Sequence, residues 1–441
     1  MNTPLPVLSP TAEPDLALAR ILFEQLREMS FDGVGITRDS YGKGEHLAHQ
    51  LLARIAEEHG LRVTRDAALN LYMTLPGRDG EAPAVMTGSH LDSVPRGGNF
   101  DGAAGVLAGI AILIGWAKAG YQPGVNVTVM AIRAEESAWF PLSYLGSKAA
   151  FGLIPVEAIE VRRFDTGRTL SAHMADFGGD ADRLVLQQPW LNANNINCFI
   201  ELHIEQGPIL EDAGQALGIV TGICGSLRYR QACASGRYAH SGATPRLHRQ
   251  DAVVAVAELV TGLYQDWMEL EQQGHQLTVT HGQIATDAQQ ADFSKVSGEV
   301  KFCVDFRSRS LQTLSLIDQR LQHRLQQITA RHGVTFDLGE QTRSAPAAMD
   351  PSLQQLLQSA AIEQQVSAMT LQSGAGHDAA LFAAQGVASA MLFVRNANGS
   401  HNPQESMAFP DFAAATRVLA QALKLRCGPG VVLGKQSDVS Y

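Results

Sequence analysis

Histidine and carboxylate side chains stand directly after the most apolar segments of this 441-residue chain. They are His90 and Asp92 after 84–87, Glu135 and Glu136 after 125–132, His203 after 198–202, and His401 after 390–394. Asp101 lies in a glycine-rich loop at 97–102, before a further apolar segment. Because Zn, Mn, Co and Ni accept mixed nitrogen and oxygen ligands, these residues predict a divalent-metal site.

Three histidines and two carboxylates are enough to hold two neighbouring ions. A carboxylate can bridge two cations with its two oxygens, and Asp101 is the expected bridge. Asp92 lies two residues beyond His90 and is expected to accept the second ring N–H, which fixes the tautomer of the ligand. Of Glu135 and Glu136, we expect one to bind metal. The other is left free as a general base for a water whose pKa the metal lowers toward ~7.

Each of these residues also has a purely structural interpretation. A histidine after a strand can serve packing or lie on the surface, and a Glu-Glu pair can belong to a solvated loop. Asp101 can simply cap the helix that follows it. Four strand ends that each carry a ligand type, together with the glycine-rich loop, favour the metal site over these separate explanations.

The elements expected around these residues would bring them together. Helices are predicted at 15–29, 45–58 and 102–120, and buried strands at 84–87, 125–132, 198–202 and 390–394. Near-continuous apolar strands between helices indicate a mostly parallel α/β sheet covered by helices on both faces. In such sheets ligands bind beyond the carboxyl ends of the strands, where the histidines and carboxylates are expected.

The pattern changes between residues 215 and 340. A strand at 219–233, a helix at 251–272, strands at 277–286 and 298–307, a helix at 311–331 and a strand at 334–338 are predicted there. The order β-α-β-β-α-β is that of a ferredoxin-like unit. We therefore expect an α/β catalytic domain formed by 1–214 and 341–441, interrupted by a smaller α+β domain at 215–340.

Composition excludes several classes of protein. Hydrophobic residues at 45% and charged residues at 18% are typical of a folded chain rather than a disordered one. A net charge of −10 without a basic stripe argues against nucleic acid as a partner. Five scattered cysteines without a C-x-x-C pair favour a reducing compartment. No secretory signal is visible, and the longest apolar run, 106–117, is short of the roughly 20 residues of a membrane helix. A cytoplasmic protein without a membrane partner is expected.

Several motifs occur together and in a fixed order: GSHLDSV, GGNFDGAAGV, ELHIEQGPILE, GRYAHSGATP, SGAGHDA and SHNPQE. As a set they resemble the M20-type metal-dependent amidohydrolases, in particular the hydantoinase/carbamoylase branch. That branch includes N-carbamoyl-L-amino-acid hydrolases, β-ureidopropionases and allantoate amidohydrolases. The resemblance covers roughly residues 15–425. His203 within ELHIEQG separates this branch from its peptidase relatives, which usually have a carboxylate there.

The resemblance implies a role for each metal-site residue. It places one metal on His90, Asp101 and His203, and the second on Asp101, Glu136 and His401, with Glu135 as the general base.

Further residues would contact the substrate or complete the site from a second subunit. The resemblance implies that His240 reaches across a dimer interface to stabilise the oxyanion, so that the 215–340 domain would serve dimerisation; alternatively His240 is a loop residue. Arg307 would bind the substrate carboxylate, for which its planar fork is suited, or else be a surface charge. Gln206 would lie near the substrate amide. His377 and Asp378 have no assigned role, since they can equally be helix-start and packing residues.

Some positions depart from the family pattern. Ser294 stands where the family usually has an Asn that helps to bind the substrate carboxylate, and Ser is too short to do the same. Trp139 in EESAWF replaces part of the usual EEGSRF, and Arg246 replaces a Met. The expected ligands are all present, whereas positions that face the substrate have changed. The chemistry is therefore better supported than any particular substrate.

The sequence thus predicts a binuclear metal hydrolase that cleaves a linear, non-peptide C–N bond. The expected substrate is a small carboxylate that carries a ureido (carbamoyl) or N-acyl group. Two divalent ions per subunit (Zn, or Mn, Co or Ni) and a homodimer are expected. The alternatives are an aminoacylase or dipeptidase of the same superfamily and, from a different class, a non-catalytic metal-binding dimer.

Overall fold

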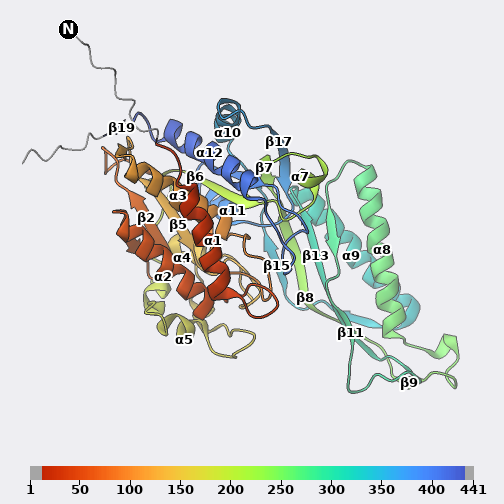
Figure 1. Cartoon of the computed structure of the whole chain (residues 1–441). Helices are drawn as coiled ribbons and strands as arrows, with labels where there is room; N and C mark the ends of the chain where they lie inside the picture. The colour runs from red at the N-terminus through yellow and green to blue at the C-terminus, as the bar shows by residue number, and fades with distance from the viewer. Residues whose placement is uncertain (1–11, 433–441) are drawn as a thin grey trace, which may run out of the picture. The chain divides into compact units, whose positions relative to one another are not determined.

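The computed structural model describes residues 12–432 and consists of two compact units (Figure 1). The larger unit comprises the described residues up to 221, 348–371 and those from 377 on, and the smaller unit comprises 222–347 and 372–376. The sequence places the insertion at 215–340. The start differs because β7 (Leu217–Ile223) pairs with β18 (Ser389–Val394) in the sheet of the larger unit. Residues 1–11, where no secretory signal is predicted, lie outside the described part.

The larger unit is built on one mixed sheet with a parallel centre. Its strand order is β1-β2-β5-β3-β6-β18-β7-β16, and β17 pairs with β7. The other strands are β1 (Arg62–Arg65), β2 (Leu71–Leu75), β3 (Ala84–His90), β5 (Val127–Ile132), β6 (Ile196–Ile204), β16 (Ala347–Ala348) and β17 (Ala368–Ser373). The pairs β5·β3, β3·β6 and β6·β18 are parallel, whereas β1·β2, β2·β5 and β7·β18 are antiparallel. The predicted mostly parallel α/β sheet is confirmed.

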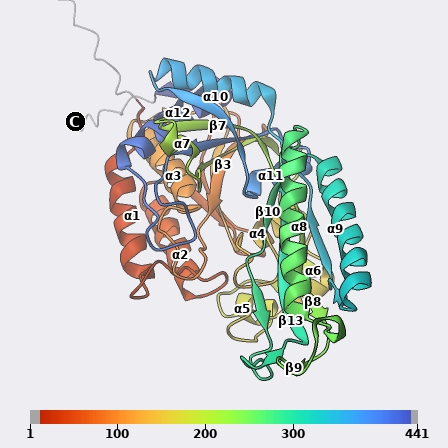
Figure 2. The same cartoon turned by 90° about the vertical axis from the view of Figure 1, so that its right-hand side faces the viewer.

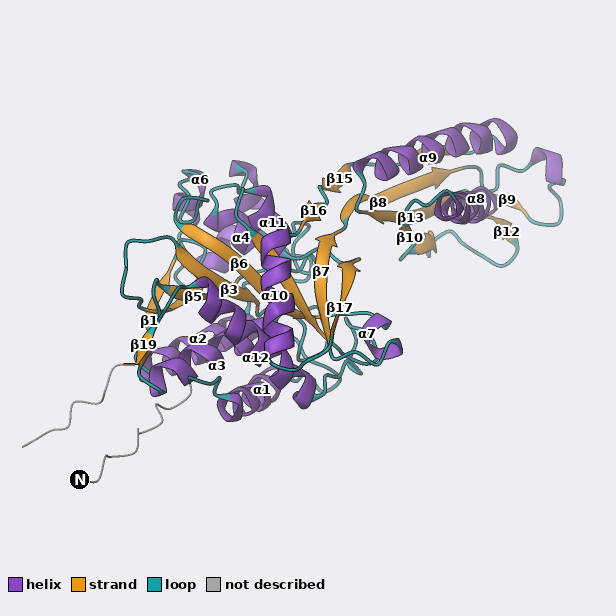
Figure 3. Ribbon diagram, turned by 90° about the horizontal axis from the view of Figure 1, so that it is seen from above, coloured by secondary structure: helices purple, strands orange, loops and turns teal. Residues whose placement is uncertain are grey.

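Helices cover both faces of this sheet (Figure 3). On one face lie α1 (Leu16–Ser30), α2 (Lys43–Glu58), α3 (Ala103–Lys118) and α12 (Phe409–Arg426), and on the other α4 (Leu145–Ala150) and α11 (Asp378–Ala384). Every residue of α3 from 103 to 116 is buried, as expected for an all-apolar helix between a sheet and outer helices. The remaining elements are α5 (Leu170–Ala175), α6 (Ala181–Val185), α7 (Ile209–Asp212), α10 (Pro351–Glu363), a 3-10 helix at Val156–Glu160, and the pair β4 (Tyr121–Gln122) and β19 (Val431–Val432).

The smaller unit has the predicted β-α-β-β-α-β order, with two long helices side by side over an antiparallel sheet (Figure 2). The helices are α8 (Ala252–Gln272) and α9 (Leu311–His332). The strands are β8 (Gly225–Ser235), β10 (Thr278–Thr280), β11 (Ile284–Thr286), β13 (Glu299–Ser308), β14 (Thr335–Asp337) and β15 (Gln341–Ser344). Their order is β10-β13-β8-β14, with β11 beside β13 and β15 beside β8. A separate ribbon joins β9 (Ala239–His240) to β12 (Lys295–Val296), and a 3-10 turn lies at Arg246–His248.

Two predicted strands are wrong in length. The segment 219–233 is divided at Cys224, because β7 pairs with β18 and β8 pairs with β13 in a different sheet. The segment 277–286 is divided into β10 and β11 opposite an irregularity between Phe302 and Val304. There the backbone amide of Cys303 donates to the carbonyl of Gln283 (3.1 Å). Local apolar content does not reveal either interruption.

All five cysteines carry free thiols. Within residues 12–432, none of the helices combines the length and the apolar character that crossing a membrane requires.

Candidate metal and catalytic site

Neighbouring strand ends of the larger sheet carry the predicted ligands. His90 is the last residue of β3, and His203 is the penultimate residue of the adjacent parallel strand β6. Glu136 follows β5, and His401 follows β18. The strands β5, β3, β6 and β18 are consecutive and parallel in the sheet. All four ligands therefore lie at the carboxyl ends of neighbouring strands.

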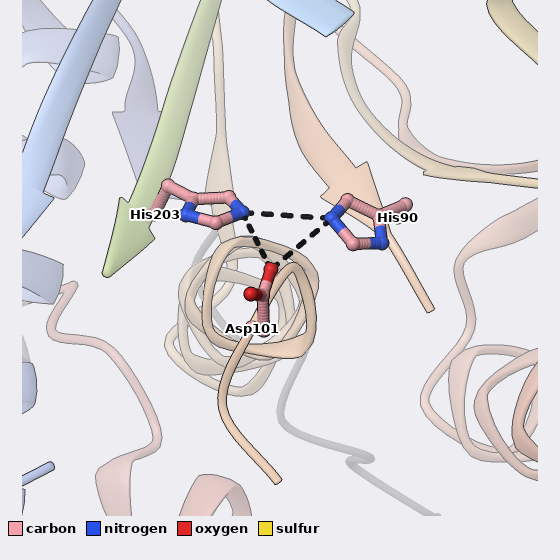
Figure 4. Close-up of side chains that lie close together, drawn as sticks. All are labelled: His90, Asp101 and His203. Atoms are coloured by element: carbon pink, nitrogen blue, oxygen red, sulfur yellow. Dashed lines mark hydrogen bonds and ion pairs between the residues drawn. The ribbon is translucent and has the colours of Figure 1, made fainter. Parts of the chain in front are cut away.

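Asp101 meets two of these histidines with one of its oxygens (Figure 4). Its Oδ1 lies 3.2 Å from Nε2 of His203 and 3.5 Å from Nε2 of His90. The two Nε2 atoms are 3.5 Å apart, so three ligand atoms converge on one point. All three side chains are buried.

The other oxygen of Asp101 faces a second group. Its Oδ2 lies 3.5 Å from Nε2 of His401, which in turn lies 3.3 Å from Oε1 of Glu136. Asp101 is therefore shared by two triplets, and within each triplet the three ligand atoms lie within 4.8 Å of one another. The side chain of His401 is 51% exposed, so this second triplet is the side of the site open to solvent.

The charges of these residues fit a cation at each triplet. Oδ1 of Asp101 is buried beside the two ring nitrogens, but no group among the described residues donates a well-aligned hydrogen bond to it, as expected for an atom that binds a metal. Burial by itself lowers the pKa of His90 and His203, but the neighbouring Asp101 raises both above the usual value. Against the same effect of burial, Glu136 and Asp101 raise the pKa of His401 to about 9. The carboxylates thus stabilise positive charge at these ring nitrogens, which a proton or a divalent ion can supply.

A third group of possible ligands, Glu201, His203 and His377, lies behind the first triplet. It shares His203 with that triplet. The Glu201 oxygens accept hydrogen bonds from Oγ of Ser89 (2.7 Å) and from the amide of Ala379 (2.8 Å). The ring of His377 packs edge-on against that of His203, with centroids 4.6 Å apart. Glu201 and His377 therefore form the wall that supports a ligand rather than a separate site.

Asp92 ties the first triplet to the two glutamates. Its Oδ1 lies 3.3 Å from Nδ1 of His90 and accepts the amide of Glu135 at 3.1 Å. Its Oδ2 accepts the amide of Glu136 at 3.1 Å and the hydroxyl of Ser40 at 2.6 Å. One carboxylate thus lies against a ligand ring and fixes the backbone of both glutamates, and the Asp92 carbonyl lies 3.1 Å from the same ring nitrogen.

The structure distinguishes the two glutamates by position. Glu136 belongs to the second triplet, whereas Glu135 belongs to neither. Burial, together with the Glu136 carboxylate, raises the pKa of Glu135 well above its usual value. A carboxyl group with a raised pKa is suited to accept a proton and pass it on.

The loop before α3 brings Asp101 against His90. A Cβ atom on Gly102 would lie 2.5 Å from the His90 ring, and the φ of Gly102 is +64°. Only glycine meets both conditions without strain. Glu405 fixes the same loop, since its Oε1 accepts the amides of Phe100 (2.9 Å) and Asp101 (3.3 Å).

Two residues of the SHNPQE motif, Ser400 and Glu405, contact Asp101, and the sequence does not predict these contacts. The Ser400 hydroxyl lies 2.5 Å from Oδ2 of Asp101 and 2.6 Å from Oε2 of Glu405. The motif contains both residues, but only the fold reveals that they approach a loop three hundred residues earlier in the chain. Arg38 is also not predicted. It is fully buried and donates to the carbonyl of Leu91 (2.6 Å) and the side chain of Asn99 (3.1 Å). Both acceptors belong to the segment that joins His90 to Asp101 in the sequence.

Gln206 lies at the same centre. Its Nε2 donates to Oδ2 of Asp101 (2.7 Å), and its amide donates to Asn396 (2.9 Å). Oε1 of Gln206 is buried without a hydrogen-bond partner within the described chain. Gln206 thus contacts the carboxylate that the two triplets share, and its expected place near the substrate amide stays a prediction.

The remaining predicted residues belong to the smaller unit. His240 is exposed on the β9·β12 ribbon, and its Nδ1 accepts the amides of Gly242 and Ala243, each at 3.1 Å. The neutral ring therefore carries its proton on Nε2, which is free to donate. Ser294 joins the same ribbon, since its carbonyl accepts the amide of Ser241 (2.9 Å). Its hydroxyl donates to Asp292 (2.7 Å).

Arg307 extends from β13 with its guanidinium partly engaged. Nε and Nη2 each lie 3.0 Å from Oδ2 of Asp305, and Nη1 donates to the carbonyl of Gly374 (3.2 Å). The side chain is 32% exposed. It remains accessible to a carboxylate.

Trp139 does not supply an apolar face open to solvent. The side chain is buried, its Nε1 donates to the carbonyl of Ser93 (2.8 Å), and the guanidinium of Arg163 lies 4.8 Å from its ring centroid. The Trp139 side chain therefore packs inside the larger unit. Arg246 is exposed on the smaller unit.

An α/β sheet whose strand ends converge on a carboxylate shared by two ligand groups defines a metal-dependent hydrolase of the two-domain type. The model of the peptidase family M20/M25/M40 matches residues 86–425, and the chain belongs to this family. The N-carbamoyl-L-amino-acid amidohydrolase of Paenarthrobacter aurescens is 32% identical over 92% of this chain and 98% of its own length. The allantoate amidohydrolase of Escherichia coli K12 is 31% identical over 88% of this chain and 92% of its own.

Solved structures agree with this assignment. A hydantoinase/carbamoylase family amidase from Burkholderia ambifaria superposes with a TM-score of 0.79 at 28% identity, over 95% of this chain and 98% of the other. AtUAH, solved in complex with glyoxylate, gives a TM-score of 0.81 at 26% identity, over 94% and 98%. The resemblance to the hydantoinase/carbamoylase branch is thereby confirmed.

Proposed function

We propose that this protein is a binuclear metal-dependent hydrolase that cleaves the carbamoyl (ureido) C–N bond of an N-carbamoyl amino acid or a related ureido acid. The observation that carries the proposal is Asp101, whose two oxygens face separate ligand triplets. The relatives support the choice of bond, since they include amidohydrolases of N-carbamoyl-L-amino acids and of allantoate.

His90, Asp101 and His203 would hold one divalent ion, and Asp101, Glu136 and His401 the second. The mixture of imidazole and carboxylate suits Zn, Mn, Co or Ni. When bound, such ions polarise a carbonyl group and lower the pKa of water toward ~7.

Glu135 would move the proton. It is held beside the ligand Glu136 but belongs to neither triplet, so its carboxylate is left to accept a proton from the attacking water. Glu135 would then pass that proton to the leaving nitrogen. Asp92 keeps the two glutamates in these separate roles through their amides.

His240 would stabilise the oxyanion of the tetrahedral transition state, in the active site of a partner subunit. Two observations support this role. The ring is exposed, and its Nδ1 accepts two amides, which leaves Nε2–H as a donor. Apolar side chains exposed along α8 support a dimer formed by the smaller unit: Val253, Val254, Tyr264 and Met268.

Arg307 would bind the substrate carboxylate, with Gln206 beside the scissile amide. Ser294 occupies the position of the usual second anchor, but its hydroxyl already donates to Asp292. The carboxylate would therefore have one strong partner on this unit instead of two.

Product analysis tests the proposal. Purified protein would be incubated with N-carbamoyl- and N-acyl-amino acids in Mn, Co, Ni or Zn, with Glu135→Gln as the inactive control. Carbamoyl cleavage releases ammonia and carbon dioxide, which we expect. Release of a free acid from N-acyl substrates only would indicate the aminoacylase alternative, and no turnover with any metal would favour a non-catalytic protein.

A further inference from the structure

The segment 133–136 carries both glutamates of the site, yet it lies beyond the end of β5 and outside any helix. Ala134 has a φ of +49°, in the left-handed region that is unfavourable for residues other than glycine. This turn decides which carboxylate faces Asp101 and which remains free. A strained backbone of this kind persists only where its surroundings hold it.

Every backbone polar group of residues 133–135 has a partner. The three carbonyls accept the amides of residues 146, 145 and 144 at 2.9–3.0 Å. The amide of Arg133 donates to Asn70 (2.9 Å), and those of Glu135 and Glu136 donate to Asp92. The one remaining donor is the amide of Ala134, the residue in the strained conformation. It donates to Oε1 of Glu45 at 2.8 Å.

Glu45 comes from the first turn of α2 and is completely buried. Its other oxygen, Oε2, accepts Nη1 of Arg133 (2.9 Å) and the amide of Tyr41 (2.8 Å). Arg133 is also buried, with 2% of its surface exposed. A single carboxylate thus fastens the side chain of one residue of the turn and the backbone of the next.

We infer that Glu45 is a positioning residue for the general base: through Ala134 and Arg133 it holds the turn that presents Glu135 to the substrate. The inference rests on the proposed function, in which Glu135 moves the proton. Glu45 contacts neither metal triplet, and it acts by fixing where Glu135 lies. A displacement of about 1 Å in a catalytic group can lower a rate by about 10²-fold.

Removing Glu45 alone would leave the Arg133 charge buried and unpaired, which would destabilise the protein for an unrelated reason. The test therefore uses Arg133→Met as a background. Glu45→Gln in that background keeps an amide oxygen for the Ala134 N–H, whereas Glu45→Leu removes the acceptor. The Gln variant thus keeps one acceptor for the amides of Ala134 and Tyr41, and the Leu variant keeps none.

With two metals bound, we expect Glu45→Leu to lower kcat by about 10- to 100-fold relative to Glu45→Gln, with KM within about twofold. Equal kcat values in the two proteins would overturn the inference. Should the double variants fail to fold, Glu45→Asp in the otherwise unchanged protein retains the charge but shortens the reach. It should lose at least about tenfold in kcat and alter the pH profile of kcat, and an unchanged kcat would equally overturn the inference.

Two controls separate this from other causes. Asp266→Asn weakens a partly buried ion-pair group, in which Asp266 contacts Arg320 and Arg324 in the smaller unit. It should lower thermal stability while leaving kcat within about twofold. If Asp266→Asn lowered kcat as much, general destabilisation would explain the effect of Glu45. Glu135→Gln in the same assay reports on the proposed function: if it retains full activity, the proposed function fails, whatever the Glu45 variants do.

Discussion

The two carboxylates Glu135 and Glu136 are adjacent in sequence but differ in their surroundings. The sequence predicts that one binds metal and one is free, and the resemblance to the family assigns them. In the structure Glu136 lies with Asp101 and His401, and Glu135 does not. What the residues alone could not reveal is the support behind the two glutamates, because Glu45 carries no local signal and its partner Ala134 lies 89 residues away in the chain.

Substitution of each glutamate should therefore have a different effect. Glu135→Gln should keep both metals and lower kcat by ~10²–10⁴, the usual contribution of a general base. Glu136→Gln should weaken the binding of one metal. Metal content and kcat measured on the same samples check this. Loss of metal in Glu135→Gln, with kcat retained by the fully loaded fraction, would show that the two roles are reversed.

Ser294 bears on substrate choice at the same scale. Its hydroxyl donates to Asp292. In the proposed function, the substrate carboxylate would therefore lack the second anchor that the family usually provides. A hydrogen bond to a charged group contributes ~1.5–3 kcal/mol, or roughly one to two orders of magnitude in affinity. Simple N-carbamoyl-α-amino acids should be poor substrates, and Ser294→Asn should lower their KM.

The comparison is kcat/KM for N-carbamoyl amino acids in both proteins, with Ser297→Asn, at a half-buried position after β12, as a control for the added side chain. A wild-type value above ~10⁴ M⁻¹s⁻¹, which lies in the range of efficient enzymes, would show that Ser294 carries no information on the substrate.

At the scale of elements, the strand ends and the loop before α3 assemble the site. Buried strands and the apolar helix α3 were predictable from their apolar runs, and with them the edge where the ligands meet. Predicted strand lengths failed at Cys224 and near Gln283, since pairing partners, which local sequence does not specify, decide where a strand ends. The edge strand β1, its neighbour β2 and the short helices between 145 and 185 also lacked a clear pattern.

Gly102 tests the assembly of the loop. Gly102→Ala would introduce a Cβ atom 2.5 Å from the His90 ring in addition to an unfavourable φ of +64°. The matched control is Gly167→Ala, where φ is +66° but nothing lies within 4 Å. The control should cost only the conformational ~1–2 kcal/mol of stability, and Gly102→Ala should also lose metal. Equal metal content in the two variants would mean that the loop can move away from His90 without disturbing the ligands.

At the scale of the whole molecule, the larger unit is interrupted in sequence by the smaller unit, which carries His240 and Arg307. The order of elements in the smaller unit, including its two helices, was predictable from the sequence pattern. The expectation that a residue of another subunit completes the site came only from the resemblance to the family. If His240 serves the neighbouring subunit, no single chain is complete.

Mixing two inactive variants tests this assembly. His240→Ala and Glu135→Gln should each have little activity. After subunit exchange about half of the dimers should contain one chain of each variant, and one of the two sites in such a dimer is intact. The mixture should therefore regain up to about a quarter of the wild-type rate. Activity and sedimentation would be measured on the same mixture. A fully active monomer would contradict the shared site.

The central claim is that a pair of metals enables cleavage of a ureido bond. The most direct test removes metal with a chelator, adds metal back in steps, and measures ammonia release from an N-carbamoyl amino acid or allantoate. Chelated protein should be inactive. Activity should rise with added Mn, Co, Ni or Zn and reach its maximum at about two ions per chain, as the two triplets that share Asp101 require. Full ammonia release by protein that contains no metal would contradict the account.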